Sequence, residues 1–213
     1  MVAKRLGSGP KEGTMIRLAG PGDAAQVAAI YAPHVTGAST SFEYAPPDAA
    51  EMAARIASTL AHMPYLVLET GGEVLGFAYA SKHRERAAYQ WSVDVSVYVR
   101  PDAHRRGVGR ALYESLFALL RLQGFYAAHA GITLPNPASV GLHEALGFRP
   151  VGVYRSVGFK RGVWHDVGWW QLALRERTGT PDPPRSLAGA QRDPEWQRAM
   201  AAGESTLNPS RDG

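Results

Sequence analysis

The residues best suited to chemistry lie in a glycine-containing turn between a strand-like and a helix-like stretch. The turn follows the valine-rich residues 93–99 and reads His104-Arg105-Arg106-Gly107-Val108-Gly109-Arg110. A helix that begins at such a turn leaves backbone N–H groups free, and its dipole adds partial positive charge, so an anion is favoured there. Arginine guanidinium groups strengthen that preference because they form charge-assisted hydrogen bonds with phosphate oxygens. The turn therefore predicts a phosphate-binding loop.

Two familiar phosphate loops do not fit these residues. A Walker loop ends in Gly-Lys-Ser/Thr, whereas Arg110 and Ala111 follow Gly109 here. A dinucleotide-binding loop needs Gly or Ala three residues after its second glycine, where this chain has Leu112. A glycine turn before an ordinary core helix remains the plain alternative.

One acid stands inside the apolar strand that precedes this turn. Strand alternation places Asp94 on the same face as Ser96 and Tyr98, opposite Val93 and Val95. A carboxylate among apolar residues is costly unless it is paired or takes part in chemistry. Asp94 is therefore a candidate functional residue, and a hydrogen-bonded structural carboxylate is an equal alternative.

A polar segment nearer the N-terminus, residues 35–44, carries the aromatic residue Phe42. Polar loops of this kind often form the walls of substrate pockets. Phe42 is therefore a candidate substrate contact, and packing into the core explains it equally well.

Composition narrows the class of protein. The 213 residues are 45% hydrophobic, which suffices for one sizeable core, and they include no cysteine, so disulfides, thiolate nucleophiles and cysteine-based zinc sites are excluded. The net charge is only +4, and the basic residues gather at 100–110 instead of forming a long stripe. This pattern favours a phosphate ligand over a nucleic acid. No apolar run approaches the roughly 20 residues of a membrane span.

Hydrophobic periodicity and turn residues predict the elements that must position these groups. One mixed α/β domain is expected over residues 15–174, after a flexible leader at 1–14. Residues 175–213 are rich in Pro, Gly and Arg, so a disordered or loosely docked tail is expected, with a short helix around Trp196 as the exception. The expected strands are residues 15–18, 65–69, 74–81, 89–99, 125–133, 149–157 and 163–174. Four helices are expected. The first follows Asp23 and ends at Pro33, and the second follows Asp48 and ends before Pro64. The third follows Gly109 and ends at Gly124, and the fourth lies between Asn136 and Gly147.

Several separate motifs, in this order of elements, resemble the GNAT superfamily of N-acetyltransferases, and within it the phosphinothricin and methionine sulfoximine acetyltransferases. The glycine turn is similar to that family's pyrophosphate loop, although His104 stands where the family has Gln or Arg. The other matching stretches are residues 91–99, 134–139, 142–148, 158–160 and 164–168. The resemblance covers essentially all of residues 15–174.

The resemblance implies a fold and a cofactor. The fold would be a mixed sheet of about seven strands flanked by four helices, with a V-shaped opening that holds acetyl-CoA. Backbone groups of Val97, Tyr98 and Val99 would pair with the pantetheine arm. The loop residues Arg105, Arg106, Gly107, Val108, Gly109 and Arg110 would hold the pyrophosphate. Asn136 matches an asparagine that contacts the cofactor arm, and it could also cap its own helix.

The resemblance also implies roles in transfer of the acetyl group. Asp94 matches a glutamate proposed as the base, although its side chain is one methylene shorter. His143 matches a histidine that protonates the departing thiolate, and imidazole titrates near neutrality. Basic residues at the positions of Arg84 and Arg86 recognise the carboxylate of the substrate, while a solvated loop is their plain alternative.

The sequence thus predicts a cytoplasmic, homodimeric N-acetyltransferase that acts on the α-amino group of a small amino-acid-like acid. Phosphinothricin or methionine sulfoximine or sulfone are the favoured substrates, and attack would be direct because no cysteine can form an acyl-enzyme. No metal, nucleic acid or membrane is expected to take part. Acetylation of another small amine or a protein N-terminus, and a CoA-binding module without turnover, remain the alternatives.

Overall fold

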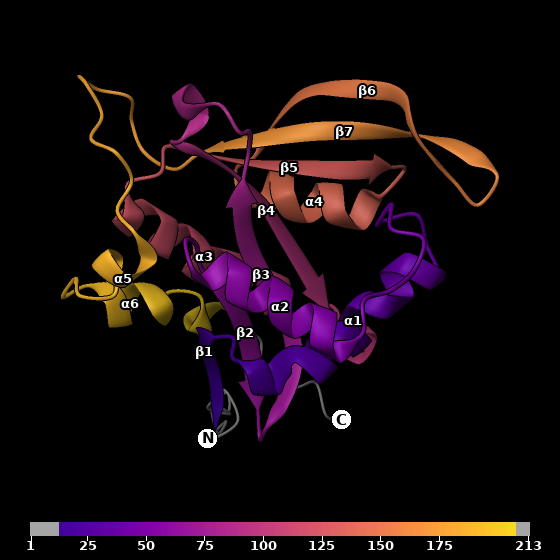
Figure 1. Ribbon diagram of the computed structural model, residues 1–213, viewed down its shortest axis with the longest axis horizontal. Coiled ribbons are helices and arrows are strands. Elements are labelled where there is room, and N and C mark those ends of the chain that lie inside the picture. Colours follow the sequence, from indigo (N-terminus) through magenta and orange to yellow (C-terminus); the bar gives the residue numbers. More distant parts are fainter. Residues whose placement is uncertain (1–12, 208–213) are drawn as a thin grey trace, which may run out of the picture.

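The computed structural model describes residues 13–207 and is built on one mixed seven-stranded sheet (Figure 1). The strand order is β1-β2-β3-β4-β5-β7-β6, and only the β4–β5 pair is parallel. The strands are β1 (Thr14–Leu18), β2 (Tyr65–Thr70), β3 (Glu73–Lys82), β4 (Ser92–Val99), β5 (Ala127–Leu134), β6 (Arg149–Lys160) and β7 (Val163–Ala173). The expected mixed α/β fold with seven strands is confirmed.

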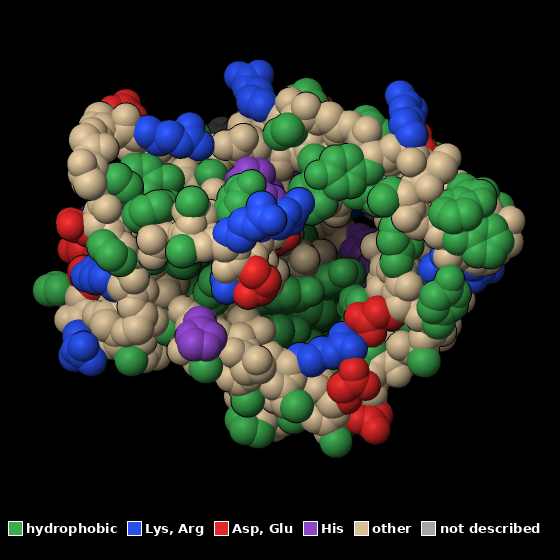
Figure 2. Space-filling model, turned by 45° about the horizontal axis from the view of Figure 1, so that its top comes forward, with side chains coloured by type: hydrophobic (Ala, Val, Ile, Leu, Met, Phe, Trp, Pro, Cys, Tyr) green, Lys and Arg blue, Asp and Glu red, His purple; other side chains and the backbone are tan. Residues whose placement is uncertain are grey.

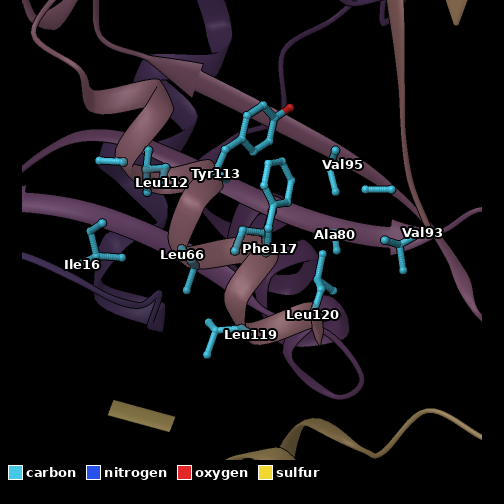
Figure 3. Packing of buried hydrophobic residues seen from close by; sticks show 14 of the residues in the cluster. Ile16, Leu66, Ala80, Val93, Val95, Leu112, Tyr113, Phe117, Leu119 and Leu120 are labelled. Carbon is cyan, nitrogen blue, oxygen red and sulfur yellow. The ribbon is translucent and has the colours of Figure 1, made fainter. Parts of the chain in front are cut away.

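Helices cover both faces of the sheet. The four longer ones are α1 (Ala24–Thr36), α2 (Ala49–Leu60), α3 (Val108–Gln123) and α4 (Pro137–Ala145). On β2, Leu66 and Leu68 belong to the core on the α3 side, whereas Tyr65 and Val67 pack with α1 and α2. This strict alternation is the strand period of two, and it divides the molecule into two cores. Figure 3 shows side chains of α3, among them Leu112, Tyr113 and Phe117, directed toward the strand residues.

Local sequence explains where the helices begin and end. The side chain of Asp48 accepts a hydrogen bond of 2.8 Å from the backbone N–H of Glu51 and so caps α2. Gly107 before α3 and Gly124 after it have φ of +86° and +97°, a conformation that glycine adopts without steric cost. The two-glycine turn between β2 and β3 also has positive φ at both residues, as a tight hairpin requires.

The sheet opens between its two central strands. β4 and β5 pair only over Ser92–Ala127, Val93–Ala128 and Asp94–His129. Beyond those pairs β4 continues against β3 and β5 continues against β7, so the two strands separate toward their carboxyl ends. The result is the V-shaped opening that the sequence predicts.

Several expected element boundaries are wrong, among them the end of the sixth strand, since β6 runs to Lys160 and not to residue 157. Pro33 does not end the first helix: α1 runs on to Thr36, and its last turn closes through the N–H of Gly37 and the carbonyl of Pro33, 2.9 Å apart. Proline there removes only one helical hydrogen bond, and the next turn is packed through the buried Val35. The fourth strand begins at Ser92 and not at residue 89, because Ala87–Tyr89 form a 3₁₀ turn.

The C-terminal segment differs from a disordered tail. Residues 175–207 cross the back of α3 and form the short helices α5 (Leu187–Ala190) and α6 (Trp196–Met200). Trp196 is only 7% exposed and lies in the core on the α3 side. A few well-spaced apolar residues therefore anchor a segment whose composition alone indicates disorder. The domain boundary at residue 174 stays a prediction, and the expected leader lies outside the described residues except for positions 13 and 14.

Candidate active site

The V-shaped opening continues into a cleft of about 910 Å3. Its walls are the separated ends of β4 and β5, the loop before α3 and the first turns of α4. The face shown in Figure 2 is hollowed, with hydrophobic side chains inside and charged and histidine side chains around the rim. The expected cofactor contacts that line the cleft are Val97, Tyr98, Val99, Arg105, Gly107, Val108, Gly109, Arg110 and Asn136. Of the expected set, only Arg106 is absent from this lining.

The loop before α3 has the geometry of an anion site. Arg105 and Gly107 both have positive φ, +61° and +86°, a left-handed backbone conformation that is typical of anion-binding turns. Gly109 brings α3 close to α4, since a Cβ atom there would lie 3.3 Å from the side chain of Leu142. His104 donates from Nε2 to the carbonyl of Val99 at 3.0 Å and so fastens the loop to the end of β4. The loop is thus held at the mouth of the opening.

Asn136 acts as the cap of α4. Its side-chain oxygen accepts a hydrogen bond of 3.1 Å from the backbone N–H of Ser139. The same residue lines the cleft, so the capping role and a contact with a bound molecule are compatible.

His143 lies on the wall of the cleft but is only 4% exposed. Its Nδ1–H donates to the carbonyl of Ser139 at 2.8 Å, so Nε2 is the acceptor for the hydroxyl of Tyr113 at 3.0 Å. Burial lowers the pKa of His143, and the bond to Ser139 opposes part of that shift. His143 is therefore a neutral imidazole with both nitrogens engaged. Sequence reasoning missed Tyr113, an isolated aromatic among the leucines of α3.

Asp94 does not line the cleft. It lies at the closed end of the V, on the sheet face opposite α3, and its Oδ1 accepts from Nδ1 of His83 at 2.6 Å. The His83 ring stacks on His129 of β5, with ring centroids 4.2 Å apart. Burial raises the pKa of Asp94, and the bond from His83 opposes that rise. Sequence reasoning missed both histidines, although His129, a polar residue in an apolar strand, carries the same kind of signal as Asp94.

The expected substrate residues are placed in two regions. The Arg84 guanidinium lies 5.7 Å from the ring centroid of Trp169 and donates to the carbonyl of His83 at 2.7 Å, beside Asp94. Arg86 is exposed and precedes the 3₁₀ turn that leads into β4. Phe42 packs over β6 at Gly158, where a Cβ would lie 2.1 Å from its ring, and it does not line the cleft.

This arrangement, a sheet split beside a glycine loop, matches a known family. The model of the acetyltransferase (GNAT) domain matches residues 16–169, and the chain belongs to the GNAT family of acetyltransferases. Within that family it falls among the phosphinothricin and methionine sulfoximine acetyltransferases, as its sequence relatives show.

Three relatives illustrate the similarity. The phosphinothricin N-acetyltransferase of Alcaligenes faecalis is 46% identical over 75% of this chain and 82% of its own length. The L-methionine sulfoximine/L-methionine sulfone acetyltransferase of Pseudomonas aeruginosa is 36% identical over 80% of this chain and 96% of its own. A Sinorhizobium meliloti phosphinothricin acetyltransferase, solved in complex with AcCoA, superposes with a TM-score of 0.75 at 36% identity, over 79% of this chain and 93% of that one.

None of the helices within residues 13–207 has the length and apolar character needed to cross a bilayer.

Proposed function

We propose that this chain transfers the acetyl group of acetyl-CoA to the α-amino group of a small amino-acid-like acid, with phosphinothricin and methionine sulfoximine or sulfone as the favoured substrates. The observation that carries the proposal is the separation of β4 from β5 immediately after three paired residues, with the loop of Gly107 at the open end. Relatives at 36–46% identity that carry these activities support the choice of substrates.

The cofactor would lie along the unpaired edge of β4. Backbone groups of Val97, Tyr98 and Val99 would bond to the pantetheine arm as an added strand would, and the N–H groups from Arg105 to Arg110 would hold the pyrophosphate. Asn136 would meet the arm from the opposite wall. The charges of Arg105, Arg106 and Arg110 would add long-range attraction for the phosphates.

Asp94 and His143 would each handle a proton during acetyl transfer, Asp94 on the side of the substrate amine and His143 on the side of the departing thiolate. Asp94, at the closed end of the V, would assist removal of a proton from the substrate amine. His143 would carry the second nitrogen proton to the leaving thiolate: Nε2 would accept it from the attacking nitrogen and pass it to the sulfur, which requires the hydrogen bond to the Tyr113 hydroxyl to open. Arg84 and Arg86 would bind the substrate carboxylate, and Phe42 would support the loop that covers the substrate.

Two further properties complete the proposal. The edge strand β6 and the start of β7 expose large apolar side chains, such as Tyr154, Phe159 and Trp164 at 50%, 48% and 61%, so we propose a homodimer through this region. Light scattering coupled to size-exclusion chromatography tests it, and a monomer at high concentration would contradict it. We also propose action in the cytoplasm, where acetyl-CoA is available, which cell fractionation tests.

The experiment that tests the activity is a thiol-release assay with acetyl-CoA. Phosphinothricin, methionine sulfoximine, methionine sulfone and a panel of amino acids, amines and N-terminal peptides serve as acceptors. Turnover on the first three is the expected result. Turnover only on other acceptors would keep the reaction and reject the substrates, whereas tight acetyl-CoA binding without turnover on any acceptor would contradict an enzymatic role.

A further inference from the structure

Three side chains from three segments meet where the V closes. Asp94 of β4 and His129 of β5 face each other in the last parallel pair before the strands separate. His83, from the connection between β3 and β4, bonds to Asp94 at 2.6 Å and stacks on His129 at 4.2 Å between ring centroids. An acetyl group at the end of a cofactor in the cleft would lie near this cluster, because Ser96 and Gly131 line the cleft two residues further along the same faces of β4 and β5 as Asp94 and His129.

A metal ion fits this cluster poorly. The three side chains do offer ligand atoms within 4.8 Å of one another. A metal, however, lies close to the plane of each imidazole that binds it, about 2.1 Å from the nitrogen. The two rings are stacked at an interplanar angle of only 17°, so their lone pairs run side by side and do not converge on one point. The nearer oxygen of Asp94 is also already bonded to His83.

We propose that His83 is the general base of the acetyl transfer and that Asp94 is its positioning carboxylate. This inference rests on the proposed function and replaces the direct role of Asp94 in proton removal. The carboxylate accepts from Nδ1–H of His83 and so fixes the tautomer in which Nε2 carries the lone pair. Within residues 13–207 no hydrogen-bond partner is recorded for that Nε2. A histidine held by a partly buried carboxylate, with its far nitrogen free, resembles the arrangement that activates bases in hydrolases.

The surroundings suit a base that gains and loses a proton. The titratable and charged groups around His83 are Asp94 from β4, His129 from β5, and Arg84 and Tyr89 from the connection. Burial lowers the pKa of His129 to about 4, so this ring is uncharged near neutral pH and does not repel a proton on His83. Trp169 of β7 stands edge-on to the His83 ring, 6.2 Å between centroids, and restricts its rotation.

The proton balance of the reaction is as follows. Nε2 of His83 takes one proton from the substrate ammonium and passes it to solvent, leaving a neutral amine. The amine lone pair forms the C–N bond at the thioester carbon, and the C–S bond electrons leave with the sulfur. The second nitrogen proton ends on the sulfur, so the products are the acetamide, free CoA thiol and one released proton. Nothing beyond the two substrates and water is required.

The test compares His83→Gln and His83→Ala with the unaltered enzyme in the thiol-release assay. His62→Gln is the matched control, a histidine near the C-terminal end of α2 and outside the cleft lining. We expect both His83 variants to lower kcat by about 10²–10⁴-fold while the Kd for acetyl-CoA, measured by calorimetry, changes by less than about twofold. We further expect added imidazole to restore part of the activity of His83→Ala.

Three outcomes would overturn the proposal. A kcat of His83→Gln within about threefold of the unaltered enzyme would return the role of base to Asp94 or to water. Stoichiometric zinc in the purified protein, with activity lost on chelation and regained with metal, would make the cluster a metal centre. Absence of turnover by the unaltered enzyme on every acceptor would reject the proposed function together with this inference, whereas turnover with an insensitive His83 rejects the inference alone.

Discussion

The two faces of the sheet at the β4–β5 junction are built from different parts of the chain. On the α3 side, the cleft presents backbone: the unpaired edge of β4 and the N–H groups of the loop at Gly107. On the opposite face, side chains from separate segments meet: His83, Asp94, His129 and Trp169. A backbone site can bind the phosphates and amides of a cofactor, which are the same in every reaction cycle. A side-chain site can be altered residue by residue, and the proposed function assigns substrate choice and proton transfer to that face.

The largest effect expected from this contrast is a loss of turnover without a loss of cofactor binding. Asp94→Asn should lower kcat by about 10²–10⁴-fold, because the amide can turn its NH2 group toward His83 and select the tautomer without a free Nε2 lone pair. The Kd for acetyl-CoA should be unchanged. Glu85→Gln, an exposed acid in the same connection, is the control, and steady-state kinetics with calorimetry provide both values. A matching loss of acetyl-CoA affinity would show that the two faces are not separable.

A smaller effect on the same face should appear in KM. Arg84→Met removes a guanidinium beside Trp169 and His83, and loss of a charged hydrogen bond to a substrate carboxylate should raise KM for the amino acid about tenfold or more. Arg86→Met is the matched comparison, because Arg86 is exposed and lies further along the connection. Equal effects of the two variants would argue that both arginines bind the carboxylate, and no effect of either would move carboxylate recognition elsewhere.

On the α3 side, adding one methyl group to the backbone of the loop should raise the Kd for acetyl-CoA more than removing one charged side chain does. Gly107→Ala forces an L-residue into a φ of +86°, which costs about 1–2 kcal/mol. If the loop relaxes to avoid that strain, the Kd for acetyl-CoA should rise about tenfold while kcat at saturating cofactor is retained. Gly107→Asn should be milder, because asparagine tolerates this conformation. Arg106→Ala should weaken binding less than Gly107→Ala, and the reverse order would mean that side-chain charge dominates the loop.

The smallest expected effect is on the pH dependence of folding stability, through His129. Burial lowers the pKa of His129 to about 4, so the unfolded chain binds a proton near pH 6 that the folded chain does not. Stability from this group is therefore lost as the pH falls through about 6.5 and is retained above it. His129→Gln should reduce the fall in Tm between about pH 7.5 and pH 5, measured by differential scanning fluorimetry. An unchanged slope would show that His129 is not responsible.

The same contrast explains how much the sequence could predict. The glycine loop, the strand before it and Asn136 are local patterns that contribute to the family resemblance, and the fold that this resemblance implies is confirmed by the seven-stranded split sheet. Asp94 could be recognised because it interrupts an apolar strand. Its partner His83 lies eleven residues earlier, in the connection before that strand, and their contact depends on how this connection folds. The pairing of His143 with Tyr113 joins α4 to α3, and no spacing along the chain encodes it. In the tail, Trp196 indicated the short helix that the structure has as α6, whereas the Pro and Gly content hid the anchoring contacts of Leu187 and Ala190.

The docked tail has a consequence for synthesis on the ribosome. The backbone N–H of Gly203 donates to the hydroxyl of Ser115 in the middle of α3, and a carboxylate oxygen of Glu204 accepts from the N–H of Ile16 in β1. The first strand and the helix that follows the loop at Gly107 thus both await residues that are translated 188 and 88 positions later. Until those residues leave the exit tunnel, the back of α3 stays uncovered. Proteases and chaperones could then reach the apolar side chains of α3 that the tail covers, and a stalled ribosome would hold the nascent chain in that state.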